Sequence, residues 1–70
     1  MAAYELLRTV NGPDGMVEVH KKRPGLIACE GYYVQNVRTK RYASLRDFDD
    51  AMREAYRLAG RNPSTYRVGD

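Results

Sequence analysis

Two segments near the start of the chain alternate between apolar and polar residues, the pattern of strands with one buried face. The first covers residues 4–10 and the second covers residues 16–22. Between them, residues 11–15 read Asn-Gly-Pro-Asp-Gly, the densest turn signal in the chain. The pattern predicts a β-hairpin closed by a five-residue loop. Alternation places Tyr4, Leu6 and Val10 on one side of the first segment, and Val17 and Val19 on one face of the second.

A second turn signal, Arg23-Pro24-Gly25, precedes the longest β-like stretch, residues 26–37. Gly31 lies inside this stretch, and a glycine within a strand pattern indicates a bulge, a bend or a break into two strands. Either one bent strand or two shorter strands therefore fit these residues. A tight turn at residues 38–40 is expected to return the chain to the end of the strand system, at residues 41–43.

Helical spacing governs the residues after position 44. Ser44 with Asp47 has the form of a capping box, and Gly60 stands where a helix commonly ends. We therefore expect a helix over about residues 45–59. Residues 64–68 are expected either to add a short edge strand or to wrap across the surface. Apolar side chains recur at helical spacing and form one stripe: Leu45, Phe48, Ala51, Met52, Ala55, Leu58 and Ala59.

The order of these elements, strands first and one helix last, predicts an α+β fold. We expect an antiparallel sheet of three or four strands, packed on one face by a single C-terminal helix. The 70 residues suit one domain without a linker. Because one helix covers only one face, the opposite face belongs to solvent or to a partner. The predicted core is Leu6, Val17, Val19, Ile27, Val34, Phe48, Met52, Ala55 and Leu58.

Composition argues against several classes of protein. A chain of this length builds a thin core and leaves no room for a large internal active-site cavity. One cysteine and one histidine argue against a disulfide framework and against a zinc site within one chain. We therefore expect no catalytic residues, no metal, no cofactor and no small-molecule substrate. The chain also lacks a long apolar run and a signal-like start, which predicts a cytoplasmic protein with no membrane partner.

Three features with potential chemistry are more simply interpreted as structure. His20 stands on the polar side of a predicted strand, where an exposed side chain is expected. Cys29 lies in an apolar run and resembles a buried small hydrophobe. The acids Asp47, Asp49 and Asp50 fall at the start of the predicted helix, where the helix dipole favours negative charge.

The net charge of +3 is distributed unevenly along the chain: −2 over residues 1–19, +5 over residues 20–43 and 0 over residues 44–70. The basic groups of the middle segment adjoin strand ends, and we expect them to converge at one end of the sheet. Basic side chains attract phosphates, and exposed tyrosine rings stack on bases. The candidate binding surface is therefore Lys21, Lys22, Arg23, Tyr32, Arg38, Lys40, Arg41 and Tyr42.

This surface predicts a non-catalytic binding module that engages an anionic macromolecule, either nucleic acid or a nucleoprotein complex. The layout of three strands followed by one amphipathic helix, over about residues 4–60, is similar to the small DNA-binding domains of the integrase arm-binding type. That resemblance implies a sheet laid in the major groove. A second hypothesis is an accessory inhibitor of the phage or mobile-element type, such as an anti-CRISPR-like protein, that docks on a host protein complex. A third is a homodimeric adaptor.

Overall fold

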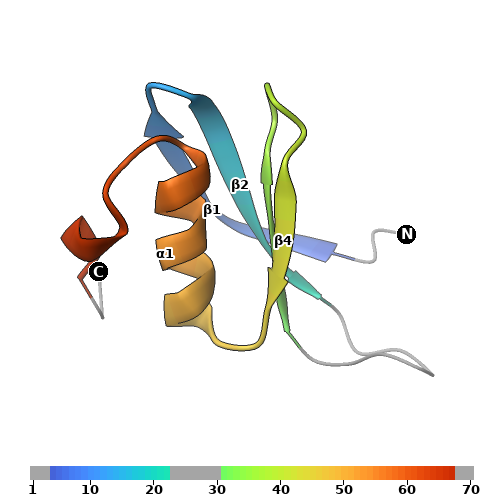
Figure 1. Ribbon diagram of the computed structural model, residues 1–70. Coiled ribbons are helices and arrows are strands. Elements are labelled where there is room, and N and C mark those ends of the chain that lie inside the picture. Colours follow the sequence, from blue (N-terminus) through green and yellow to red (C-terminus); the bar gives the residue numbers. More distant parts are fainter. Residues whose placement is uncertain (1–3, 23–30, 68–70) are drawn as a thin grey trace.

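The computed structural model, which describes residues 4–22 and 31–67, places one helix against one face of a four-stranded sheet (Figure 1). Every neighbouring pair of strands is antiparallel, and the order β1-β2-β3-β4 follows the chain. The predicted α+β class is confirmed. The elements are β1 (Tyr4–Gly12), β2 (Gly15–Lys22), β3 (Tyr32–Asn36), β4 (Tyr42–Leu45), α1 (Phe48–Leu58) and the 3-10 helix η1 (Pro63–Thr65).

The β1–β2 hairpin closes more tightly than its turn signal predicts. Gly12 pairs with Gly15, so only Pro13 and Asp14 lie outside the ladder. The expectation of a five-residue loop is therefore wrong. Pro13 and Asp14 both have negative φ, as in an ordinary turn, and Gly15, which follows them as the first residue of β2, has a φ of 121° that favours glycine.

A bulge at Leu7 divides β1 into two halves. Because of the extra residue, Leu6 and Arg8 face opposite sides of the sheet although they are two positions apart. Leu6 lies opposite His20, whereas Arg8 lies opposite Val19, so the alternation shifts by one residue between them. Figure 1 shows the first half of β1 turning away from the helix. The predicted core position of Leu6 is wrong, because Leu6 lies on the uncovered face with 52% of its surface exposed.

The core lies between α1 and the face of the sheet that it covers. Val17, Val19 and Val34 are fully buried, as predicted, and so is Ala55. Met52 is also buried, whereas Phe48 and Leu58 pack at the margin of the core and are only partly buried. Ile27 lies outside the described residues. The further buried side chains are Val10, Asn36, Ala51, Ala59 and Tyr66.

The helix begins at Phe48 rather than at about residue 45, because β4 uses the preceding residues. Ser44, expected as the N-cap, lies opposite Tyr33 in the sheet. The observed N-cap is Asp47, whose carbonyl accepts a hydrogen bond from the Ala51 N–H at 2.9 Å. At the other end Gly60 has a φ of 86°, the left-handed conformation predicted for the residue after the helix.

The tail wraps across the helix and adds no strand within residues 64–67. Tyr66 is buried, its ring lies edge-on to that of Tyr56, and its hydroxyl donates to the Asp49 carboxylate at 2.8 Å. Burial and this hydrogen bond raise the pKa of the Tyr66 hydroxyl. Asp49 therefore holds the tail in place.

One buried polar side chain joins the β1–β2 loop and the β3–β4 turn to the end of α1. The Asn36 Nδ2 donates to the Asp14 carbonyl at 3.1 Å and to the Leu58 carbonyl at 2.9 Å. Its Oδ1 accepts from the backbone N–H groups of Arg38 at 2.8 Å and Thr39 at 3.0 Å. We refer to this meeting point of the β1–β2 loop, the β3–β4 turn and the helix end as the turn junction.

Candidate functional site

No described element covers the face of the sheet opposite α1, and we refer to it as the open face. Of the large hydrophobic side chains exposed in the described residues, all except Leu7 lie there. Its members include one acid, Glu18, one lysine, Lys22, and one histidine, His20. Strand alternation and register assign to it Tyr4, Leu6, Thr9, Asn11, Met16, Glu18, His20, Lys22, Tyr33, Gln35, Val37, Tyr42 and Ser44.

An aromatic row crosses the open face with one side chain from each strand: Tyr4, His20, Tyr33 and Tyr42. The Tyr33 ring stacks against Tyr4 at a centroid distance of 5.3 Å and against Tyr42 at 5.6 Å. The His20 ring lies 6.3 Å from Tyr4 and 6.4 Å from Tyr33. Burial, together with the neighbouring Tyr4 and Tyr42, raises the pKa of the Tyr33 hydroxyl. Tyr33 is thus the centre of the row.

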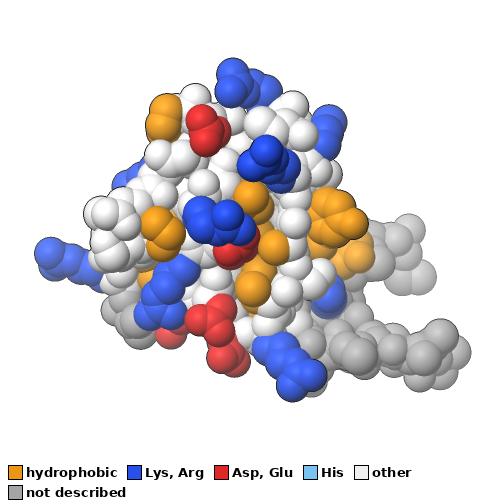
Figure 2. All heavy atoms as spheres, viewed as in Figure 1, with side chains coloured by type: hydrophobic (Ala, Val, Ile, Leu, Met, Phe, Trp, Pro, Cys, Tyr) orange, Lys and Arg blue, Asp and Glu red, His pale blue; other side chains and the backbone are white. Residues whose placement is uncertain are grey.

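The stacking leaves the aromatic row unevenly exposed. Rings stacked at about the strand spacing cover much of each other's faces. The two rings on the outer strands β1 and β4 are the more exposed, Tyr4 with 44% and Tyr42 with 66% of the surface accessible. Figure 2 shows hydrophobic side chains gathered on the side of β4 away from the helix, whereas cations and acids are interspersed over the helix.

The sequence predicted an exposed His20 side chain. In the structure this side chain is instead half-buried within the aromatic row. Its Nε2 lies 3.2 Å from the Glu18 carboxylate. Its Nδ1 is buried and has no hydrogen-bond partner within the described ranges. His20 and Glu18 therefore engage each other, and the other polar residues beside them, Thr9, Gln35 and Ser44, are uncharged.

The two basic groups of the chain do not converge. Lys21 and Lys22 end β2, which pairs with the beginning of β3, whereas Arg38, Lys40 and Arg41 follow the end of β3. The five residues of β3 separate the two groups by roughly 16 Å, at ~3.3 Å per residue. The expectation of one basic end is wrong, because antiparallel neighbours run in opposite directions.

Neighbouring tyrosines in β3 face opposite sides of the sheet. Tyr32, predicted for the binding surface, packs on the helix side with its ring edge-on to Phe48 at 5.6 Å. Lys21 lies opposite Tyr32 and so faces the same side. Tyr33 was missed, although a signal existed: once Val34 is assigned to the core, alternation turns Tyr33 to the other face. Tyr4 and His20 were missed as well.

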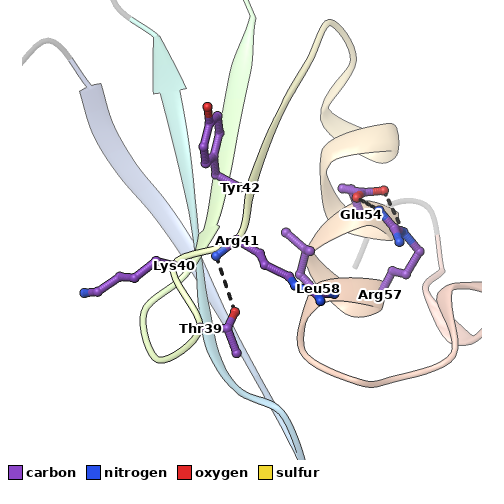
Figure 3. A pocket seen from close by; sticks show the side chains of 7 residues that line it. All are labelled: Thr39, Lys40, Arg41, Tyr42, Glu54, Arg57 and Leu58. Carbon is purple, nitrogen blue, oxygen red and sulfur yellow. Dashed lines mark hydrogen bonds and ion pairs between the residues drawn. The ribbon is translucent and has the colours of Figure 1, made fainter.

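The β3–β4 turn divides its cations between the two sides of the sheet. Figure 3 shows Arg41 pointing towards α1, beside Leu58 and Arg57, while Lys40 points away from the helix. The hollow between this turn and α1 has a volume of about 390 Å³. Arg57 is paired there with Glu54, which raises the pKa of its guanidinium.

Few of the predicted basic residues adjoin the aromatic row. Lys22 lies on the open face opposite Tyr4. Lys40 lies beside the open face at the opposite end of the sheet, in the β3–β4 turn. The Arg38 side chain turns to the β1–β2 loop, where its Nε donates to the Asp14 carbonyl at 3.2 Å. Arg23 lies outside the described residues. The candidate site is therefore a face with little charge, which carries the aromatic row and the exposed hydrophobic side chains and has a lysine at each end.

Comparison with protein families, curated proteins and solved structures finds no match for this chain. Residues 4–22 and 31–67 contain no group of three or more His, Cys, Asp or Glu side chains placed to hold a metal ion. Neither helix in these ranges combines the length and apolar character that a membrane crossing requires.

Proposed function

We propose that the chain is a non-catalytic binding module whose open face docks on another protein. The partner surface is apolar and is bordered by acidic side chains. The observation that carries the proposal is the concentration of exposed hydrophobic side chains on the open face, around the aromatic row. Interface centres are poor in charge and rich in tyrosine and methionine, and contiguous apolar patches mark interaction sites.

The charge distribution favours a protein partner over nucleic acid. A surface that binds nucleic acid neutralises several phosphates with Lys and Arg, but the open face carries one lysine, Lys22, against one acid, Glu18. Bases also need free ring faces on which to stack, and Tyr33 is stacked on both sides. Lys22 and Lys40 instead complement acidic side chains around an apolar partner patch.

Single-stranded nucleic acid is the second candidate, and one observation favours it. Tyr42 is the most exposed ring of the aromatic row, and it follows Lys40 and Arg41 directly in the chain. An exposed ring beside cations is the arrangement on which unpaired bases stack. This candidate retains the anionic partner expected from the sequence.

Docking through the open face accommodates an accessory inhibitor, a homodimer and a cytoplasmic site of action. An accessory inhibitor of the phage or mobile-element type, such as an anti-CRISPR-like protein, acts by occupying a surface of another protein and needs no catalytic group. A homodimer through the open face is the third arrangement to test. A cytoplasmic site of action is also part of the proposal, since the sequence has a lone thiol, Cys29, which suits a reducing compartment.

The test compares retention of host proteins by the immobilised chain and by two variants, Tyr33→Ala and Tyr42→Ala. Truncating a central interface tyrosine costs about 2 kcal/mol, which is roughly a thirtyfold loss of affinity. We therefore expect both variants to lose a partner that the unchanged chain retains. Arg53→Ala, an exposed change on α1, is the control and keeps the partner. Circular dichroism checks that each variant is folded.

The same extract, treated with nuclease and washed at high salt, separates the candidates. Retention that survives both treatments supports a protein partner, because contacts in an apolar interface are weakly screened. Retention lost with nuclease supports nucleic acid. A purified chain whose mass by light scattering is that of a dimer, and whose Tyr42→Ala variant is monomeric, identifies a second copy as the occupant. Equal retention by all variants contradicts the use of the open face.

A further inference from the structure

A recess on the helix side of the sheet is separate from the open face. It lies between the outer strand β1 and the packed pair of α1 and tail, with a volume of about 360 Å³. Its floor consists of the buried side chains Val10, Met52 and Tyr66. Its rim includes Arg8 and Arg61. We refer to this recess as the β1 groove.

The strand beside the β1 groove has a free edge. In the described residues β1 pairs only with β2, so alternate backbone N–H and C=O groups along its outer side have no ladder partner. Residues 8–11 pair with β2 in regular register, because the bulge precedes them at Leu7. An extended peptide can therefore add to this segment as a fifth strand.

Two guanidinium groups at the rim of the β1 groove remain available to a ligand. The Arg8 guanidinium lies 5.6 Å from the centroid of the Phe48 ring, and the Arg61 guanidinium lies 4.4 Å from that of Tyr56. Neither arginine forms an ion pair with a residue that the structure describes. A guanidinium that stacks on a ring keeps the donors at its edge free for a carboxylate.

We propose that the β1 groove binds an extended acidic peptide, which pairs with residues 8–11 of β1. Side chains two positions apart in a strand face the same side. An apolar side chain of the peptide then packs on Met52 and Tyr66, and a carboxylate two positions away meets Arg8 or Arg61. This site does not depend on the open face, and the two proposals fail independently.

A second copy of the chain fits the β1 edge less well than an acidic peptide. Arg8 is the middle residue of β1. Antiparallel pairing of two β1 strands about their centres therefore places Arg8 opposite Arg8 of the second copy. Like charges directly opposite each other destabilise a strand pair. A peptide glutamate opposite Arg8 instead attracts the Arg8 guanidinium.

The test is a titration of the full isotope-labelled chain with the peptide acetyl-Glu-Thr-Val-Thr-Glu-amide, followed by nuclear magnetic resonance. We expect shifts confined to the amides of residues 8–11 and to the tyrosine rings of the β1 groove, with slower hydrogen exchange along β1. Arg61→Glu is expected to weaken binding at least tenfold. Arg46→Glu, the same charge change outside the groove, leaves binding unaltered.

Two further peptides keep the test independent of any variant's stability. A peptide with lysine in place of both glutamates is expected not to bind, because it meets the two arginines with like charge. A peptide methylated on its threonine amide nitrogens is expected to lose binding, because it cannot complete the ladder. Equal binding of either peptide, shifts located on the open face, or no shift at millimolar concentration would overturn the proposal.

Discussion

Asn36→Ala is expected to lower the free energy of unfolding by about 3 kcal/mol, because it removes four hydrogen bonds from the turn junction at once. The Asn36 side chain is fully buried, so the groups left behind do not regain water easily. A domain of this size has a total stability of roughly 4–10 kcal/mol. The change therefore removes a large share of it.

Thermal and urea unfolding measure this loss. A change of about 3 kcal/mol corresponds to a fall in Tm of roughly 12–24 °C for a chain of this size. Asn11→Ala is the matched control, since Asn11 is exposed on β1 and its replacement is expected to cost less than ~0.5 kcal/mol. If the two variants unfold alike, Asn36 does not hold the turn junction together.

Asn36→Asp separates the donor role of this side chain from its acceptor role. The introduced carboxylate keeps an acceptor for Arg38 and Thr39 but directs an oxygen at the carbonyls of Asp14 and Leu58. Burial and these carbonyls raise the pKa of the introduced carboxyl in the folded state. The folded state then binds more protons than the unfolded state, so stability falls as the pH rises through the folded pKa. The defect is expected to be smallest at acid pH.

Gly12→Ala is the second change with a large expected effect. A Cβ at this position would lie 2.2 Å from the Ala59 carbonyl oxygen and 2.9 Å from its carbon. Both are backbone atoms, so no side-chain rotation relieves the overlap. The β1–β2 loop must move away from the helix, which breaks the hydrogen bond from the Asp14 N–H to the Ala59 carbonyl at 2.9 Å. We expect a loss of about 2–3 kcal/mol.

Urea unfolding of Gly12→Ala, with Thr9→Ala as an exposed control on the same strand, measures this loss. The control is expected to cost less than ~1 kcal/mol. Because Gly12 and Asn36 act on the same turn junction, the double variant should lose less than the two single variants together. Losses that add in full, or a Gly12→Ala variant as stable as the unchanged chain, contradict this account of the junction.

The elements that could be predicted from the sequence are those set by local periodicity. The apolar stripe around Met52 and Ala55 repeats at the helical period, which predicted the helix. Val17 and Val19 alternate at the strand period, which predicted the hairpin. Where two structures competed for the same residues, local pattern was insufficient. Ser44 is a good N-cap, but pairing with β3 outweighs the capping preference, and the helix starts later.

Features that depend on distant partners escaped prediction. The bulge at Leu7 exposes Leu6 without leaving a mark in the hydrophobic pattern. The burial of Asn36 depends on Asp14 and Leu58, each 22 residues away in the chain. Predicting such a side chain requires the tertiary arrangement, because asparagine in a β-like stretch is not by itself a sign of burial.

The candidate site was predicted only in part, because the placement of its residues also depends on the tertiary arrangement. Tyr42 was assigned to the binding surface and lies on the open face, but Tyr32 points to the helix and Tyr33 takes the central position. The positive charge of residues 20–43 is divided between the two ends of the sheet. Charge counted along the chain does not give its position in space, and the open face carries one lysine and one acid rather than a basic cluster.

Photo-crosslinking from the open face shows whether a protein docks there. The photoreactive residue p-benzoylphenylalanine replaces Tyr42 in one variant and Arg53, exposed on α1, in a control. After irradiation in an extract of the host cells, we expect one protein adduct from position 42 that persists after nuclease treatment, and none from position 53. Equal adducts from both positions, or an adduct from position 42 that nuclease removes, would contradict docking of a protein on the open face.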